Sequence, residues 1–307
     1  MNKYKQLTAG ALAVALMGVI AAPLYAQLPA HLRGFPLTQP KASGDIVAPM
    51  FNGWVPHEDG SVTMVFGFAN RNREEIVDIP LGPNNYIEPA QFDGVQPTHF
   101  PTNRPRGLVG VQERGVFAVT VPAAIAGTEV VWTLKHAGHS YSIPGRTASV
   151  FYELSRAERA LGSLLPAIRF DMGGSESTDR EGIYAPRLTT SVGTAVTLSA
   201  YVQDRGVRAD YDVDQLVFSL GTEWILHQGP ARPSFDNARI TGRERAENGE
   251  SGTSGNNGWT EVTTQATFPE PGDYIVRLRV DNFTAPDSQF DNLCCWSNAY
   301  VPVTVNP

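Results

Sequence analysis

Short runs in which apolar and polar residues alternate dominate the chain from residue 44 onward. The runs at 61–68 and 115–121 are rich in Val, Phe and Thr, and clusters of Gly, Pro, Asn and Asp separate such runs from one another. This alternation is typical of antiparallel strands that bury one face in a sandwich or barrel. With further strands predicted at 128–135 and 148–152, residues 44–154 are expected to form a first β-sandwich domain.

The same alternation returns later in the chain and predicts a second β domain over residues 187–307. The fold class expected for the whole chain is therefore all-β, with two antiparallel β-sandwich domains in tandem. The predicted strands of the second domain lie at 195–202, 215–220, 222–227, 260–268, 274–280 and 299–305.

The stretch between these two domains, residues 155–186, is interpreted as a connector. Ser155 is a favourable helix N-cap residue and Glu158 follows three positions later, as in a capping box. A short helix is therefore expected at 155–161. Residues 171–186 are polar and contain several glycines and serines, which is typical of a linker.

Two aromatic residues of the second domain favour an immunoglobulin-like (Ig-like) sandwich. Trp224 lies in a mid-domain strand, and Tyr274 opens a late strand after a Pro-Gly-Asp corner. A tryptophan between the sheets and a tyrosine at such a corner fill the core of Ig-like domains. Residues 187–305 resemble a bacterial Ig-like domain of the PKD type. The resemblance implies a module that holds, spaces or binds, and it implies no catalytic activity.

Segments of the first domain resemble an uncharacterised family of secreted bacterial β-sandwich proteins. The segments that carry this resemblance are 66–75, 79–85, 96–100 and 130–134. Together with the second domain, the resemblance extends over most of the chain after its N-terminal segment. It implies secretion and β structure, and it transfers no activity.

Composition excludes several structural classes. Of the 307 residues, 42% are hydrophobic, which is enough for one or two packed cores and excludes a disordered chain. Gly and Pro number 29 and 23, while only 18% of the residues are charged. This surplus of turn-forming residues favours β structure and excludes collagen and coiled coil.

The N-terminus has the pattern of a secretory signal peptide. Lys3 and Lys5 precede an uncharged apolar run over 7–22, and cleavage is predicted after Ala26. The run is shorter than the roughly 20 residues that a membrane span needs. We therefore predict a signal peptide at 1–26, followed by an extended leader at 27–43. The mature chain is expected in the periplasm, at the cell surface or in the medium, with no transmembrane segment.

Cleavage would leave a more acidic chain. Residues 1–26 hold two lysines and no acidic residue, so the formal charge would change from −7 to −9. Most remaining basic residues are scattered arginines, without a basic stripe that could neutralise phosphates. We therefore expect no nucleic-acid partner.

The two cysteines, Cys294 and Cys295, are adjacent in the sequence. Neighbouring residues cannot join distant strands, so we favour a vicinal disulfide between them. Two free thiols, a bond to another chain and a soft-metal site are the alternatives. A vicinal disulfide would fix a tight turn before Trp296 and could present that ring as a binding surface.

Two acidic clusters supply the hard oxygen ligands that calcium prefers. The cluster at 210–214 alternates like an EF-hand loop, but Gln215 stands where that loop needs glycine and no glutamate follows at its twelfth place. A solvated acidic loop is the favoured interpretation, and calcium is the only cofactor considered. The candidate calcium ligands are Asp204, Asp210, Asp212, Asp214, Asp281, Asp287 and Asp291.

The histidines give little support for a catalytic or zinc site. His136 and His139 have zinc-like spacing, but they flank Ala-Gly between two alternating runs and are interpreted as a β-hairpin turn. His57 and His99 would favour an enzyme only if the fold brought them together with an acidic residue. No nucleophile-elbow or phosphate-loop motif is found in the sequence.

These patterns favour a secreted, non-catalytic binding or structural protein of the bacterial cell envelope. An envelope protein or a glycan is the expected partner, and the candidate binding residues are Trp296, Trp54 and Tyr86. The alternative is a secreted hydrolase or carbohydrate-active enzyme with an accessory Ig-like domain. An enzyme needs polar groups that converge in a cleft, whereas a binding module offers an aromatic surface on loops.

Overall fold

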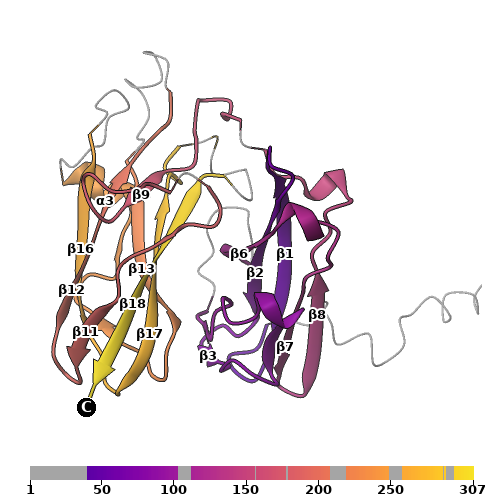
Figure 1. Ribbon diagram of the computed structural model, residues 1–307. Helices are drawn as coiled ribbons and strands as arrows, with labels where there is room; N and C mark the ends of the chain where they lie inside the picture. Colours follow the sequence, from indigo (N-terminus) through magenta and orange to yellow (C-terminus); the bar gives the residue numbers. More distant parts are fainter. Residues whose placement is uncertain are drawn as a thin grey trace, which may run out of the picture. The chain divides into compact units, whose positions relative to one another are not determined.

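The computed structural model confirms an all-β chain with two β-sandwiches (Figure 1). It describes residues 40–102, 112–155, 157–177, 179–207, 219–248, 258–285, 287 and 294–307. The predicted signal peptide and most of the predicted leader lie outside these residues. Lys41–Pro307 form one compact unit that contains both sandwiches.

The first sandwich contains two three-stranded antiparallel sheets and one short strand pair. One sheet has the order β1-β2-β6 and the other the order β4-β7-β8, while β3 pairs with β5. Their bounds are β1 Val47–Pro56, β2 Val62–Asn70, β3 Val77–Asp78, β4 Asn85–Glu88, β5 His99–Phe100, β6 Glu113–Val121, β7 Val131–His136 and β8 His139–Pro144. The described residues of this part also form the 3₁₀ turns η2 Ala90–Phe92, η4 Ala123–Ile125 and η5 Val150–Tyr152.

An aromatic cluster fills the space between the two sheets of the first sandwich. Phe66 stacks on Phe117, and both rings meet Trp132 edge to face. The indole Nε1 of Trp132 donates a hydrogen bond of 3.0 Å to the buried side chain of Asn85. A buried indole N–H needs such a partner, so this polar pair fixes the position of the ring within the core.

The second sandwich packs a six-stranded sheet against a four-stranded sheet. The larger sheet has the order β10-β18-β17-β13-β15, with β11 also paired to β18, and the smaller has the order β14-β16-β12-β9. The strands are β9 Ala167–Arg169, β10 Ile183–Tyr184, β11 Leu188–Ser191, β12 Val196–Gln203, β13 Gly221–Gln228, β14 Ser234–Phe235, β15 Arg239–Ile240, β16 Thr260–Thr267, β17 Gly272–Asp281 and β18 Trp296–Asn306. A short helix, α3 Gly242–Glu247, follows β15.

The two aromatic residues that predicted an Ig-like sandwich lie in its core. Trp224 on β13 and Tyr274 on β17 are both buried. The Tyr274 hydroxyl donates a 2.8 Å hydrogen bond to the backbone carbonyl of Glu270. A tyrosine that bonds the backbone a few residues upstream is the tyrosine corner of Ig-like sandwiches.

The predicted connector differs from its expectation. Its residues form β9 and β10, which pair with β12 and β18, so this part of the chain belongs to the second sandwich. The helix predicted at 155–161 is wrong for the described residues, which form turns and irregular chain. The only capping box among the described residues belongs to Thr241 and Glu244 at the start of α3.

Two other local predictions have clear outcomes. The strand predicted at 148–152 is wrong, because that stretch contains the 3₁₀ turn η5. The hairpin predicted at His136 and His139 is confirmed, because these residues pair across a two-residue turn. Ala137 and Gly138 both have positive φ, as a type I′ turn requires. Most of the strand predicted at 215–220 lies outside the described residues.

Candidate functional site

The candidate site is the junction at which the two sandwiches contact each other. The backbone N–H of Thr98 donates to the carbonyl of His227, over 2.8 Å. The amide of Gln228 donates to the carbonyls of Gly94 and Gln96, at 2.8 and 2.7 Å. These bonds join the loop before β5 to the end of β13.

A buried ionic cluster lies within the junction. Arg277 and Arg279 both project from β17 and are almost fully buried. The carboxylate of Glu113, at the start of β6, pairs with both guanidinium groups, and its nearest oxygen lies 3.2 Å from Nη2 of Arg277. Glu223 on β13 pairs with Arg279 as well. Alternate residues of a strand share one face, so both arginines reach the same cluster.

The electrostatics of the cluster follow from its burial. Burial lowers the pKa of Arg277, and the neighbouring Glu113 carboxylate partly offsets this effect. Burial also disfavours the charged form of Arg279, but the nearby carboxylates of Glu113, Glu223 and Asp281 outweigh it and raise the pKa. Removing charges from water is costly unless they are paired, so these arginines depend on Glu113 and Glu223.

Neutral polar side chains of the second sandwich extend the junction beyond the charges. The hydroxyl of Tyr300 donates to the carbonyl of Val116 over 3.0 Å, and the Asn298 amide donates to Gly115 over 2.6 Å. Burial raises the pKa of Tyr300, so the phenol stays protonated and remains a donor. These bonds attach β18 to the backbone of β6.

His227 is a fully buried neutral residue in the same region. Its Nε2 donates to the carbonyl of Val95 over 2.9 Å, and its ring meets Tyr300 edge to face. Burial, followed by the nearby Arg277 charge, lowers the pKa of His227 to about 3. The imidazole is therefore uncharged at neutral pH and acts as a fixed hydrogen-bond donor.

The structure distributes the three predicted binding residues over three places. Trp296 is buried, at 6% exposure, with its ring against Gly115 and Phe283. Trp54 is half-buried and donates from Nε1 to the carbonyl of Ser149. Tyr86 is half-buried, with the Lys135 ammonium 5.3 Å from its ring centre. The ring of Trp296 thus contributes to the junction, and the predicted ligand-binding role of the three residues stays a prediction.

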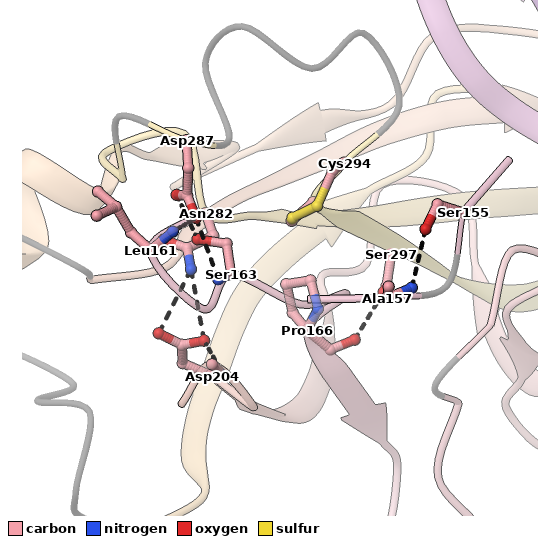
Figure 2. Close-up of a disulfide and its surroundings, with 12 residues drawn as sticks. Ser155, Ala157, Leu161, Ser163, Pro166, Asp204, Asn282, Asp287, Cys294 and Ser297 are labelled. Carbon is pink, nitrogen blue, oxygen red and sulfur yellow. Dashed lines mark hydrogen bonds between the residues drawn. A yellow bond between two sulfur atoms is a disulfide. The ribbon is translucent and has the colours of Figure 1, made fainter. Parts of the chain in front are cut away.

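Cys294 and Cys295 are joined by a disulfide and are both buried (Figure 2). The carbonyl of Cys295 accepts a hydrogen bond from the backbone of Asn282, which ties the start of β18 to the end of β17. The adjacent Ser297 hydroxyl donates to the carbonyl of Pro166 over 2.6 Å. The cysteine pair therefore lies inside a hydrogen-bonded segment that leads directly to Trp296.

The described candidate calcium ligands already accept hydrogen bonds from protein groups. Asp287 accepts from the backbone N–H groups of Leu161 and Ser163 and from the Ser163 hydroxyl, and Asp204 accepts weakly from Asn282 (Figure 2). Asp281 lies at the end of β17 and accepts from the backbone of Phe283. The other four candidates, Asp210, Asp212, Asp214 and Asp291, lie outside the described residues. Within the described part of the chain, no cluster of three or more potential metal-binding side chains is found.

The histidines named for the enzyme alternative lie in separate networks. His57 bonds the Thr63 hydroxyl at 2.6 Å. His99 bonds Asp78 at 2.6 Å, and Arg232 of the second sandwich pairs with the same carboxylate. Burial raises the pKa of Asp78, but the contacts with His99 and Arg232 outweigh it and lower the pKa overall. His99 therefore belongs to the junction, and the triad that would have favoured an enzyme is not assembled from these two histidines.

The ionic cluster could not be predicted from the sequence. Arg277 and Arg279 alternate with Val276 and Leu278, which is the pattern of a strand with one solvated face. The first sandwich covers that face instead. Ile275, an apolar residue on the same face as the arginines, was the only local signal of partial burial.

No family model matches the chain, and no curated protein matches it. Similar solved structures include the D0-D1 domain of intimin, with 11% identity, a TM-score of 0.24 and coverage of 84% of this chain and 100% of that one. The Yersinia pseudotuberculosis adhesin InvE shares 9% identity, with a TM-score of 0.22 and coverage of 85% and 58%. The tandem Ig domains of titin share 11% identity, with a TM-score of 0.20 and coverage of 84% and 97%. At these scores the likenesses do not bear on function.

None of the helices in the described parts of the chain has the length and apolar character that a membrane crossing requires.

Proposed function

We propose that this protein is a secreted, non-catalytic binding or structural protein of the bacterial cell envelope. The observation that carries the proposal is the junction. Two β-sandwiches contact each other through backbone hydrogen bonds, the Glu113 cluster and the buried Trp296. Such a unit holds its loops at fixed separation, which is what a spacer or a presenting module needs.

The composition of the junction supports this role. Inter-domain contacts in a chain are ordinarily modest and permit relative motion. Here the segment after the first sandwich adds β9 and β10 to the second one, so little free linker remains between them. Asp287 adds three hydrogen bonds that hold Leu161 and Ser163 against the second sandwich. A protein built this way keeps its two ends at a fixed separation.

Export and the envelope location rest on the N-terminal pattern of Lys3, Lys5 and the apolar run. The partner is proposed to be an envelope protein or glycan, bound by loops of the two sandwiches. Calcium remains a proposed additional ligand of the acidic loops, with Asp204, Asp281 and Asp287 as its described candidates.

The test is co-sedimentation of the purified mature chain with isolated envelopes, with peptidoglycan sacculi and with outer-membrane vesicles. We expect saturable retention by at least one of these fractions, and no turnover of ester or glycoside substrates. Absence of retention by all three fractions, or substrate turnover that survives purification, would overturn the proposal.

A further inference from the structure

A cavity of about 330 Å³ lies between the first sandwich and the segment that follows it. This volume is at the lower end of the range found for small-molecule sites, roughly 300–1,000 Å³. Neither the junction contacts nor the disulfide segment uses it. Its described lining comes from β1, β2, the chain before β9, the chain before β10 and the chain after β12.

One part of the lining is apolar. Val55 on β1 is buried, and Leu164 and Leu165 lie half-buried in the segment before β9. When an apolar group replaces water against hydrophobic side chains in a cavity wall, the free energy of the complex falls. This wall therefore suits a short hydrocarbon chain.

The polar floor of the cavity is already occupied by internal hydrogen bonds. The Thr63 hydroxyl bonds His57 and Thr120, each at 2.6 Å, and donates weakly to Glu181 at 3.4 Å. Burial, followed by the Asp179 charge, raises the pKa of Glu181 and disfavours its anionic form. The floor thus offers a ligand little additional hydrogen bonding and a reduced negative charge.

Two arginine side chains form the cationic side of the cavity. Arg180 and Arg205 both line it and are half-buried. Arg205 has no hydrogen-bond or ion-pair partner among the described residues, whereas the half-buried Arg239 pairs with Glu223. A guanidinium binds a carboxylate through two parallel hydrogen bonds, so Arg205 is suited to an anionic head group. Asp179 opposes this charge only from an exposed position, where solvent screens it.

We propose that this cavity binds a small amphiphilic carboxylate. The carboxylate pairs with Arg205, beside Arg180, and the hydrocarbon part lies against Val55, Leu164 and Leu165. The site goes beyond the proposed envelope function and does not depend on it, because the sandwich loops remain free for another partner.

The test is isothermal titration of the purified chain with octanoate. Acetate, which lacks the hydrocarbon part, and octylamine, which carries the opposite charge, are the matched probes. We expect octanoate to bind at least about tenfold more tightly than either of them, a difference of about 1.4 kcal/mol. Equal binding of octanoate and octylamine, or no heat from octanoate at millimolar concentration, would overturn the site.

Arg205→Gln is the decisive variant, and Arg243→Gln is its control with the same change of charge. Arg243 is exposed on α3 and does not line the cavity. We expect Arg205→Gln to weaken octanoate binding about tenfold, and Arg243→Gln to leave it unchanged. Thermal melting verifies that each variant is folded, and Arg180→Gln is titrated in addition. Octanoate binding of wild-type strength in both cavity variants refutes the assignment, whatever the result of the envelope co-sedimentation.

Discussion

Glu113 and Arg277 form an ion pair of 3.2 Å, and the two residues come from different β-sandwiches. The carboxylate of Glu113 also pairs with Arg279, so one acidic side chain serves two buried cations. Breaking a buried pair leaves an uncompensated charge, which costs far more than an exposed pair contributes. The junction between the sandwiches therefore depends strongly on this single residue.

Glu113→Gln is expected to lower the free energy of unfolding by about 3–5 kcal/mol, because it leaves Arg277 without its buried partner. The control is Asp273→Asn, which breaks the exposed Arg187–Asp273 pair and should cost less than about 1 kcal/mol. Denaturant unfolding followed by tryptophan fluorescence measures both. Equal losses in the two variants would show that the Glu113 cluster is not effectively buried.

Gly115→Ala should also weaken the junction. Gly115 has φ +57°, and a Cβ added there would lie 2.8 Å from Nε1 of Trp296. The matched control is Gly44→Ala, where φ is +69° and the added Cβ meets no atom within 4 Å. We expect the control to lose about 1–2 kcal/mol from backbone strain alone, and Gly115→Ala to lose a further 1–3 kcal/mol or so from overpacking. Indistinguishable stabilities would contradict the placement of Trp296.

Because the pKa of His227 is lowered, we expect the free energy of unfolding to decrease at mildly acidic pH. Its pKa falls from 6.5 to about 3 on folding, because the ring is buried and lies near Arg277. Above pH 6.5 the ring is neutral in both states. Between pH 6.5 and about 3 the unfolded chain binds a proton that the folded chain does not, so the free energy of unfolding decreases as pH falls. The slope is at most about 1.4 kcal/mol per pH unit.

The measurement is a comparison with His227→Gln, whose amide can still donate to Val95. Carboxylates such as Asp45, whose pKa is also shifted, contribute equally to both proteins and cancel in the difference. We expect the stability advantage of wild type over the variant to shrink as the pH is lowered from 6.5 to 4. A constant difference over that range would argue against a buried neutral imidazole.

The disulfide between Cys294 and Cys295 should protect both sulfur atoms from alkylation until it is reduced. Mass spectrometry after alkylation should show no modified cysteine in the native or denatured chain, and two after reduction. Denaturation is included because both residues are buried and a buried thiol would escape the reagent. Two alkylated thiols in the denatured, unreduced protein would rule the disulfide out.

The fold could be predicted because its signals are local. Trp224 and Tyr274 mark the core of the second sandwich, and the two-residue turn at Ala137 and Gly138 requires positive φ. The period-2 pattern placed most of the long strands. The helix predicted at 155–161 does not form among the described residues, because a capping box alone stabilises a short helix by only a small amount. Hydrogen bonds to Asp287 hold this part of the chain instead.

The junction could not be predicted because its signals are not local. Arg277 and Arg279 look like solvated residues on one face of a strand until a second sandwich covers that face. Trp296 follows a cysteine pair in a loop, which suggested an exposed ring. Its ring instead lies against Gly115, which is 181 positions earlier in the chain, on β6. Only the pairing of distant segments reveals such contacts.

Differential scanning calorimetry of the mature chain tests most directly whether the two sandwiches act as one unit. We expect a single transition in which the calorimetric and van't Hoff enthalpies agree, because the Glu113 cluster couples the two sandwiches. Two separate transitions, with positions that Glu113→Gln does not change, would contradict it.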